Sequence, residues 1–177
     1  FHFNEAAKVL YEFTWNDFCD WYVEIAKTRF YGNDEGKADI ARTVSLKCIR
    51  TVLALLHPYS PFITEDLWSH FKTANALDLI VDQWPERDFK SLNDNAEKEM
   101  VLLQKVVTAI RSIRSRMNVP PSKFPDLVVR CDDDQASFLE NHVELLKSLA
   151  RIGEMTLGES IEKPGQSATA VVGGMEM

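Results

Sequence analysis

The stretch NDNAEKEMVLLQKVVTAIRSIRSRMNVPPSKFPDLVVRC, residues 93–131, contains the change of pattern that decides the fold. Its first part predicts a helix from about Asn93 to Met117, because apolar residues recur there at helical spacing: Met100, Leu103, Val107 and Ile110. The Pro120-Pro121 pair ends this helix, since proline cannot donate to the helical hydrogen-bond ladder. Residues 126–131 then predict a strand. We therefore expect a domain boundary near Pro121.

Upstream of this stretch, the sequence predicts three further helices, which with residues 93–117 form a four-helix bundle. They span approximately 4–30, 38–56 and 61–72. Ser60-Pro61 marks the start of the third, as an N-cap followed by proline in the first helical position. The spacing in that helix predicts that Ile63, Leu67 and Phe71 face the core. Residues 74–92 are expected to be irregular.

Downstream of the boundary, the sequence predicts a small α/β unit with the order β-α-β-β. Its predicted elements are a strand at 126–131, a helix at 134–150, and strands at 154–157 and 170–172, with a Gly/Pro/Ser linker near 158–167. The expected fold class is therefore mainly α. A helical bundle occupies residues 1–121, and the α/β unit occupies residues 122–177.

The composition is that of a globular chain of 177 residues, with 45% hydrophobic and 27% charged residues. Three cysteines, Cys19, Cys48 and Cys131, are far apart and lack C-x-x-C spacing, so neither a disulfide framework nor a zinc site is indicated. We expect a reducing compartment, the cytoplasm. No apolar run reaches the roughly 18–20 residues of a membrane span, and no signal-peptide pattern occurs.

The sequence shows no motif for catalysis or for cofactor binding. Glycine-rich nucleotide-binding motifs and paired metal ligands are absent, and the four histidines lie in no catalytic pattern. The run 132–134, three aspartates, could hold a cation, but acids at a helix N-terminus are the simpler interpretation. We therefore predict no catalytic residue, no bound cofactor and no metal site in this chain.

Positive charge is concentrated in one stretch, although the net charge of −7 argues against a dedicated nucleic-acid binder. Residues 101–125 contain no acid, whereas residues 126–162 contain nine acids and three bases. Arginine suits phosphate because its planar fork can bond two oxygens at once. The alternative is that these cations stabilise a helix C-terminus, by about 0.3–1 kcal/mol each. The predicted phosphate-binding candidates are Lys105, Arg111, Arg114, Arg116 and Lys123.

Three segments, in order along the chain, resemble the valyl-tRNA synthetase family. They are FNEAA, LYEF and WNDFCDWYVE within residues 3–24, LHPYSPFITEDLW at 56–68, and IRSIR with MNVPPSK within 110–123. The middle segment is shared with the related isoleucyl and leucyl enzymes. The first and last segments point to the valine member. The resemblance covers essentially the whole chain.

This resemblance implies the helical anticodon-binding domain of a class I aminoacyl-tRNA synthetase, followed by a small α/β unit. In that family a catalytic domain precedes this region and a coiled-coil arm follows it. The expected parent is a valine–tRNA ligase, which joins valine to its tRNA using ATP and Mg²⁺. The expected partners are valine tRNA, the catalytic domain and the arm. Anticodon-binding activity is thus expected of this region.

The family's HIGH-like and KMSKS-like motifs and its editing domain do not occur in this sequence. We therefore expect a fragment that is inactive alone. The resemblance also implies that the bundle lacks its first helix, because in the family the bundle begins with a helix upstream of Phe1. The large apolar rings of Phe1 and Phe3 at the start of the chain also favour an excised piece. Two alternatives stay open: the corresponding domain of an isoleucyl-type enzyme, and a helical protein-interaction module that does not bind RNA.

Overall fold

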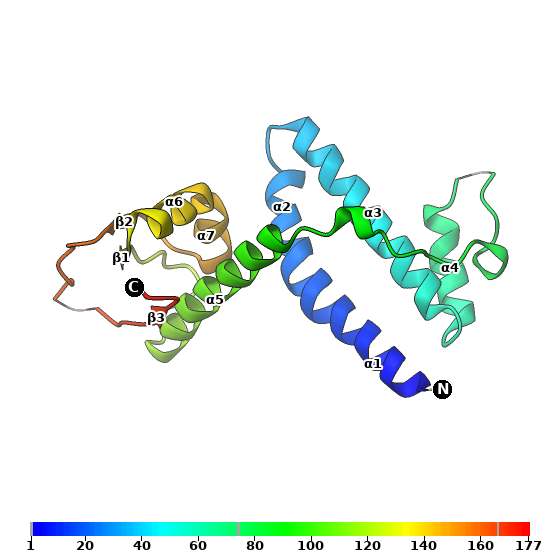
Figure 1. Cartoon of the computed structure of the whole chain (residues 1–177), viewed down its shortest axis with the longest axis horizontal. Helices are drawn as coiled ribbons and strands as arrows, with labels where there is room; N and C mark the ends of the chain where they lie inside the picture. The colour runs from blue at the N-terminus through cyan, green and yellow to red at the C-terminus, as the bar shows by residue number, and fades with distance from the viewer. Residues whose placement is uncertain (1, 74, 166) are drawn as a thin grey trace. The chain divides into compact units, whose positions relative to one another are not determined.

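Helices dominate both units of the chain, Phe1–Lys90 and Ser91–Met177, in agreement with the predicted mainly α class (Figure 1). The computed structural model describes residues 2–73, 75–165 and 167–177. Phe1 lies outside the described residues, as do Ala74 in the predicted irregular segment and Gln166 in the predicted linker. Among the described residues, no helix has both the length and the apolar character needed to cross a membrane.

The first unit begins with a continuous helical rod, where the sequence predicted a single helix. The rod consists of α1 (Phe3–Glu12), a π-helical section (Phe13–Val23) and α2 (Glu24–Phe30). Leu10, Phe18 and Ile25 are buried along it. Their separations of eight and seven residues are those of one helical stripe, so the buried side of the rod continues through the π-helical section.

Helices α3 (Glu35–Leu56) and α4 (Pro61–Phe71) complete the first unit. Pro61 occupies the first turn of α4, as predicted. At the start of α3, the Asp34 carboxylate accepts a hydrogen bond from the Lys37 backbone N–H at 3.1 Å, and this bond lowers the pKa of Asp34. Short 3₁₀ turns follow at Leu79–Val81 and Phe89–Ser91.

The buried face of α4 differs from the prediction. Thr64 and Trp68 are buried, whereas Ile63 and Leu67 are 55% and 41% exposed, so the predicted inward positions of these two residues were wrong. The cause is a pair of anchors to the following loop. The Trp68 indole donates to the Leu77 carbonyl at 3.1 Å, and the Glu65 carboxylate accepts from the Leu79 amide at 2.9 Å. These bonds orient the helix with Trp68 toward Leu53 and Leu79.

The second unit begins with α5 (Asp94–Arg116), close to its predicted bounds. Asn93 caps it, because its side-chain oxygen accepts from the Asn95 and Ala96 amides at 3.1 Å each. The helix packs against α7 (Val143–Ala150) and β3 (Val171–Val172). Its buried residues include Leu103, Val107 and Ile110 of the predicted stripe.

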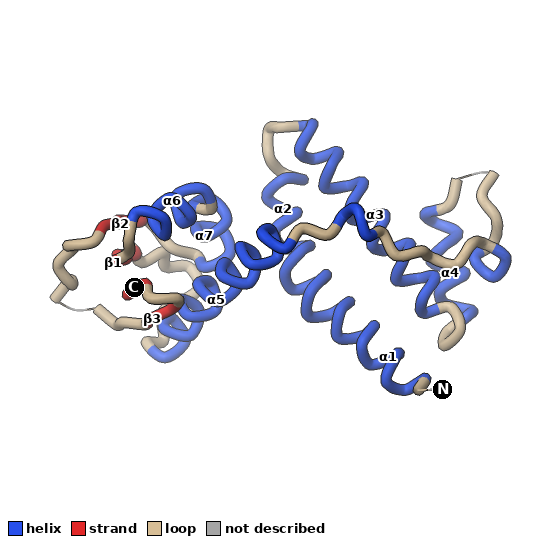
Figure 2. The backbone as a smooth tube through the Cα atoms, in the orientation of Figure 1, coloured by secondary structure: helices blue, strands red, loops and turns tan. Residues whose placement is uncertain are grey.

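A mixed sheet of four strands occupies the second unit, one strand more than predicted (Figure 2). The remaining strands are β1 (Leu127–Arg130), β2 (Met155–Gly158) and β4 (Met175–Glu176), and the strand order is β2-β1-β4-β3. β1 and β2 are parallel, and the other pairs are antiparallel. The unpredicted β4 pairs with β3 through Gly173 and Gly174, whose φ angles of +57° and +88° suit a two-residue hairpin turn.

The single helix predicted for 134–150 is in fact two helices, α6 (Asp133–Asn141) and α7. They meet at His142, where the imidazole packs on the Phe138 ring with centroids 4.6 Å apart. Its Nδ1 also lies 2.8 Å from the Phe138 carbonyl oxygen. A side chain that bonds the carbonyl four residues back offers the backbone an alternative to the helical bond, and the helix breaks there.

The two units divide between Lys90 and Ser91, whereas the sequence places a boundary near Pro121. The difference concerns α5, which we expected in the bundle. In the structure it belongs to the unit that contains the sheet, because the face that includes the fully buried Val106 and Val107 packs with α7 and β3. The burial of these apolar side chains, rather than the position of the proline pair, determines the unit to which α5 belongs.

Removal of the α5 N-cap should destabilise the second unit. We expect Asn93→Ala to lower the free energy of unfolding by about 0.5–2 kcal/mol, because two backbone amides lose their acceptor. Urea denaturation followed by circular dichroism measures this. Asn95→Ala, in the exposed first turn, is the matched control. Equal midpoints for the two variants would contradict the capping role.

Candidate nucleic-acid interface

The predicted phosphate-binding residues do not share one environment. Lys105 and Arg116 are exposed on α5, and Lys123 is exposed on the turn that follows. These three side chains form no hydrogen bond or ion pair with any residue that the structure describes. Lys105 and Arg116 are 11 residues apart, which puts them on the same side of the helix and about 16 Å apart along its axis. Their charges are therefore available to an external anion.

Arg111 is partly committed to the fold. Its backbone lies on α5, and its Nε donates a hydrogen bond to the Leu149 carbonyl at the end of α7, at 3.0 Å. The residue as a whole is still exposed. Arg111 thus joins α5 to α7 and keeps part of its charge at the surface.

Arg114 has a structural role that the sequence analysis did not foresee. It is 9% exposed, and its guanidinium donates to three backbone carbonyls. The distances are 2.6 Å to Arg151, 3.1 Å to Pro120 and 2.9 Å to Lys123. Because the side chain is buried and its donors are engaged, we leave Arg114 out of the proposed interface. A signal existed in the sequence, since Arg114 continues the buried series of Leu103, Val107 and Ile110.

Arg151 was missed and lies beside the predicted residues. It ends α7 with a φ of +52°, and its NH1 donates to the Pro121 carbonyl at 3.2 Å. The side chain is exposed. A left-handed residue after a helix is most often glycine, so nothing in the sequence marked Arg151. The exposed cations of this unit that we consider together are Lys105, Arg111, Arg116, Lys123 and Arg151.

The turn formed by residues 117–125 is held at several points. Asn118 is left-handed with a φ of +51°, and the Lys123 amide donates to the Pro120 carbonyl at 3.0 Å. The Gly153 amide donates to the Pro125 carbonyl at 2.9 Å. A Cβ on Gly153 would lie 2.5 Å from Asp126 Oδ1 and 2.9 Å from the Phe124 carbonyl oxygen, so only glycine fits this approach.

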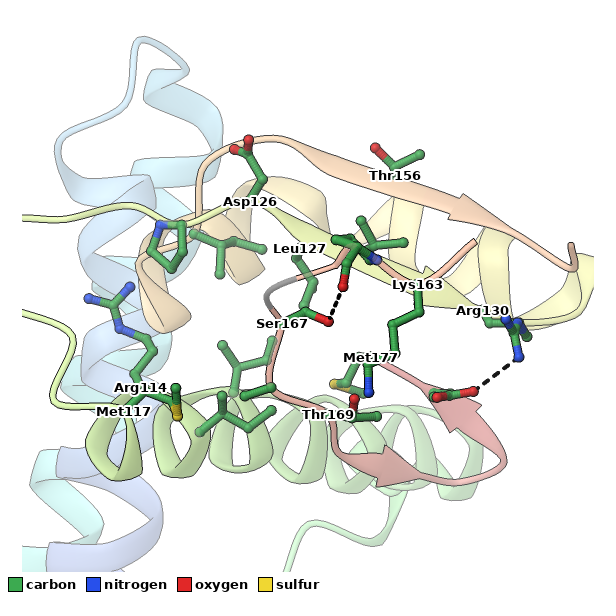
Figure 3. A pocket seen from close by; sticks show the side chains of 18 of the residues that line it. Arg114, Met117, Asp126, Leu127, Arg130, Thr156, Lys163, Ser167, Thr169 and Met177 are labelled. Carbon is green, nitrogen blue, oxygen red and sulfur yellow. Dashed lines mark hydrogen bonds and ion pairs between the residues drawn. The ribbon is translucent and has the colours of Figure 1, made fainter. Parts of the chain in front are cut away.

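A cavity of about 570 Å³ lies on the inner side of this turn, and Figure 3 shows its lining. Arg114 and Met117 stand at one end and Arg130 at the other. Arg130 is paired with Glu176 at 3.2 Å and also donates to the Ile161 carbonyl at 2.9 Å. The remaining wall is largely apolar, and it comes from the C-terminal half of α5, from β1 and from residues 161–164 and 167–169. We assign no reaction chemistry to this cavity.

Neither metal binding nor thiol chemistry is favoured by the described residues. Across residues 2–73, 75–165 and 167–177, no group of three or more His, Cys, Asp or Glu could hold a metal ion. Asp132 instead caps α6 in a reciprocal pair with Gln135, as expected for a helix N-terminus. Burial raises the pKa of the Cys48 and Cys131 thiols and so keeps them protonated and weakly nucleophilic at neutral pH.

Comparison with known proteins identifies the family. A family model for the anticodon-binding domain of tRNA ligases matches residues 1–129. This chain belongs to that anticodon-binding family. The match includes all five cations predicted from the sequence and ends inside β1, so Arg151 lies beyond it.

Similar full-length proteins are valine–tRNA ligases. The chain is 37% identical over 183 residues to the one from Geobacter sulfurreducens, 35% over 179 residues to that from Geobacillus kaustophilus, and 34% over 178 residues to that from Bacillus subtilis. Each alignment covers all of this chain and 20% of the relative. The chain therefore spans about a fifth of the length of the curated relatives it matches. This agrees with the resemblance to the valyl-tRNA synthetase family.

The loss of Arg114 should destabilise the second unit. We expect Arg114→Ala to lower the free energy of unfolding by about 3 kcal/mol or more, since buried carbonyls left without donors cost about 1–3 kcal/mol each. Arg116→Ala, two residues away and exposed, should stay within about 0.5 kcal/mol of the parent chain. Chemical denaturation compares the two, and equal losses would refute the structural role of Arg114.

Proposed function

We propose that this chain is the anticodon-binding part of a valine–tRNA ligase, and that its exposed cations bind the phosphate backbone of valine tRNA. The family match over residues 1–129 carries the proposal, because that region includes the acid-free stretch 101–125. The available charges of Lys105, Arg116 and Lys123 support it. The names of the aligned relatives favour the valine enzyme over the isoleucyl-type alternative and over a protein-interaction module.

In this proposal the chain contributes binding rather than chemistry. Phosphate contacts position a nucleic acid, whereas contacts to base edges and faces read it. A single strand on a positively charged face, next to a net-negative body, is held where the cations are and repelled elsewhere. A net charge of −7 for the whole chain, combined with a local cationic stretch, therefore agrees with selective rather than general RNA binding.

The parent reaction would be the joining of valine to its tRNA, with ATP and Mg²⁺ handled by other parts of the ligase. The remaining four-fifths of a relative's length could hold the catalytic domain and the coiled-coil arm as intramolecular partners. We propose a cytoplasmic setting for this function. This chain should then supply a tRNA-binding surface only.

The first test is a salt-titrated binding assay of this chain with valine tRNA. We expect weak binding that falls as salt increases, because released counterions dominate the affinity. Arg116→Gln with Lys123→Gln should weaken binding and reduce the slope of log affinity against log salt by about 0.7–0.9 for each lost phosphate contact. Lys163→Gln, an exposed lysine outside the acid-free stretch, is the matched control. Salt-independent binding, or none, would refute tRNA binding by this chain.

A second test addresses the absence of catalysis. The chain alone should show no valine-dependent ATP–pyrophosphate exchange, because the sequence contains neither of the family's ATP-handling motifs. The assay uses radiolabelled pyrophosphate with valine, ATP and Mg²⁺. A full-length valine–tRNA ligase serves as the positive control. Exchange above the protein-free background would show that the chain carries chemistry of its own.

A further inference from the structure

Phe124 is an exposed aromatic ring on a fixed backbone. It is 59% exposed, and Met117, the residue that follows α5, is 61% exposed. Yet the backbone on both sides of Phe124 is tied down. Arg114 holds the Lys123 carbonyl at 2.9 Å, and Gly153 holds the Pro125 carbonyl at 2.9 Å. The ring is therefore presented to solvent with little backbone freedom.

Cationic residues lie close to Phe124 in the sequence. Lys123 precedes it directly, and Arg116 ends the helix that leads into the turn. Neither has a hydrogen-bonding or ionic partner among the described side chains. Arg151 approaches the same turn through its bond to the Pro121 carbonyl at 3.2 Å. The next acid, Asp126, accepts a hydrogen bond from the Glu154 amide at 2.9 Å.

We propose that the turn formed by residues 117–125 is a stacking platform for an unpaired base of the bound RNA. The Phe124 ring would lie against the face of the base. Lys123 and Arg116 would bind the phosphates on either side of that nucleotide. The proposal rests on the proposed function and deepens it, because it names the segment that contacts unpaired nucleotides.

The combination of ring and charge favours RNA over a protein partner. A protein contact would bury Phe124 and Met117, and would need acids opposite Arg116, Lys123 and Arg151. A single strand of RNA supplies both requirements itself, with a π-face on each base and a negative charge on each phosphate. Stacking tolerates any base, so this platform adds affinity for unpaired nucleotides without selecting their sequence.

Rigidity strengthens the proposal. A flexible loop would lose conformational freedom on binding, and that loss would reduce the affinity. Here the turn is already ordered in the folded chain, so binding removes little further conformational freedom. Arg114, the turn bond from Lys123 to Pro120 and the close approach of Gly153 together fix the platform before RNA arrives.

The test compares ring variants of this chain in binding to valine tRNA and to a fully paired RNA hairpin with a minimal loop. Phe124→Leu should weaken tRNA binding about tenfold, within the range expected for one stacked base. The salt slope should not change, because no charge is removed. Phe124→Tyr keeps the ring and should bind as the parent chain does. Phe62→Leu, at a 90% exposed ring of the first unit, is the matched control.

The outcomes separate the two proposals. Weaker tRNA binding for Phe124→Leu at constant salt slope, with binding to the paired hairpin unchanged and with recovery in Phe124→Tyr, supports the platform. Parent-like tRNA binding by Phe124→Leu overturns it and leaves tRNA binding intact, as would be expected if the ring faces a protein. No salt-dependent RNA binding by the parent chain overturns the proposed function and the platform together. Circular dichroism of each variant confirms that the comparison is between folded proteins.

Discussion

The guanidinium of Arg114 is the group on which the second unit depends. From the last turn of α5 it reaches the carbonyls of Pro120, Lys123 and Arg151. One side chain thus ties the end of a helix, the turn that follows it and the end of α7. A buried cation is tolerated because its donors meet carbonyl oxygens that would otherwise lack partners. These bonds fix the path of the chain from α5 into β1.

The same interaction divides the basic stretch into two classes of residue. Arg114 and Arg116 are two positions apart, about 200° around the helix, so when one faces the core the other faces solvent. Burial of Arg114 therefore helps to hold Arg116 outward. Composition alone cannot make this distinction, because both residues add one positive charge to an acid-free stretch. The helical series of buried positions makes it, since Arg114 belongs to the series and Arg116 does not.

Local signals explain what the sequence could predict. Pro61 and Asn93 begin their helices through geometry and hydrogen bonds that involve neighbours within a few residues. The structure differs from the sequence-based predictions where contacts between residues far apart in the chain determine the conformation. The face of α4 depends on loop bonds made by Trp68 and Glu65, 9 and 14 residues away in the chain. The left-handed Arg151 depends on contacts with a turn about 30 residues earlier.

The packing of α5 also separates the family region from the folding unit. The family match ends at residue 129, but the buried side of α5 packs against α7 and β3, which both lie beyond that residue. A chain cut at residue 129 would expose Val106 and Val107 and would remove the Arg151 carbonyl from Arg114. Burial of two valine side chains stabilises a fold by about 3–6 kcal/mol. The anticodon-binding region as matched therefore depends on α7 and β3, which lie outside it, to cover the buried face of α5.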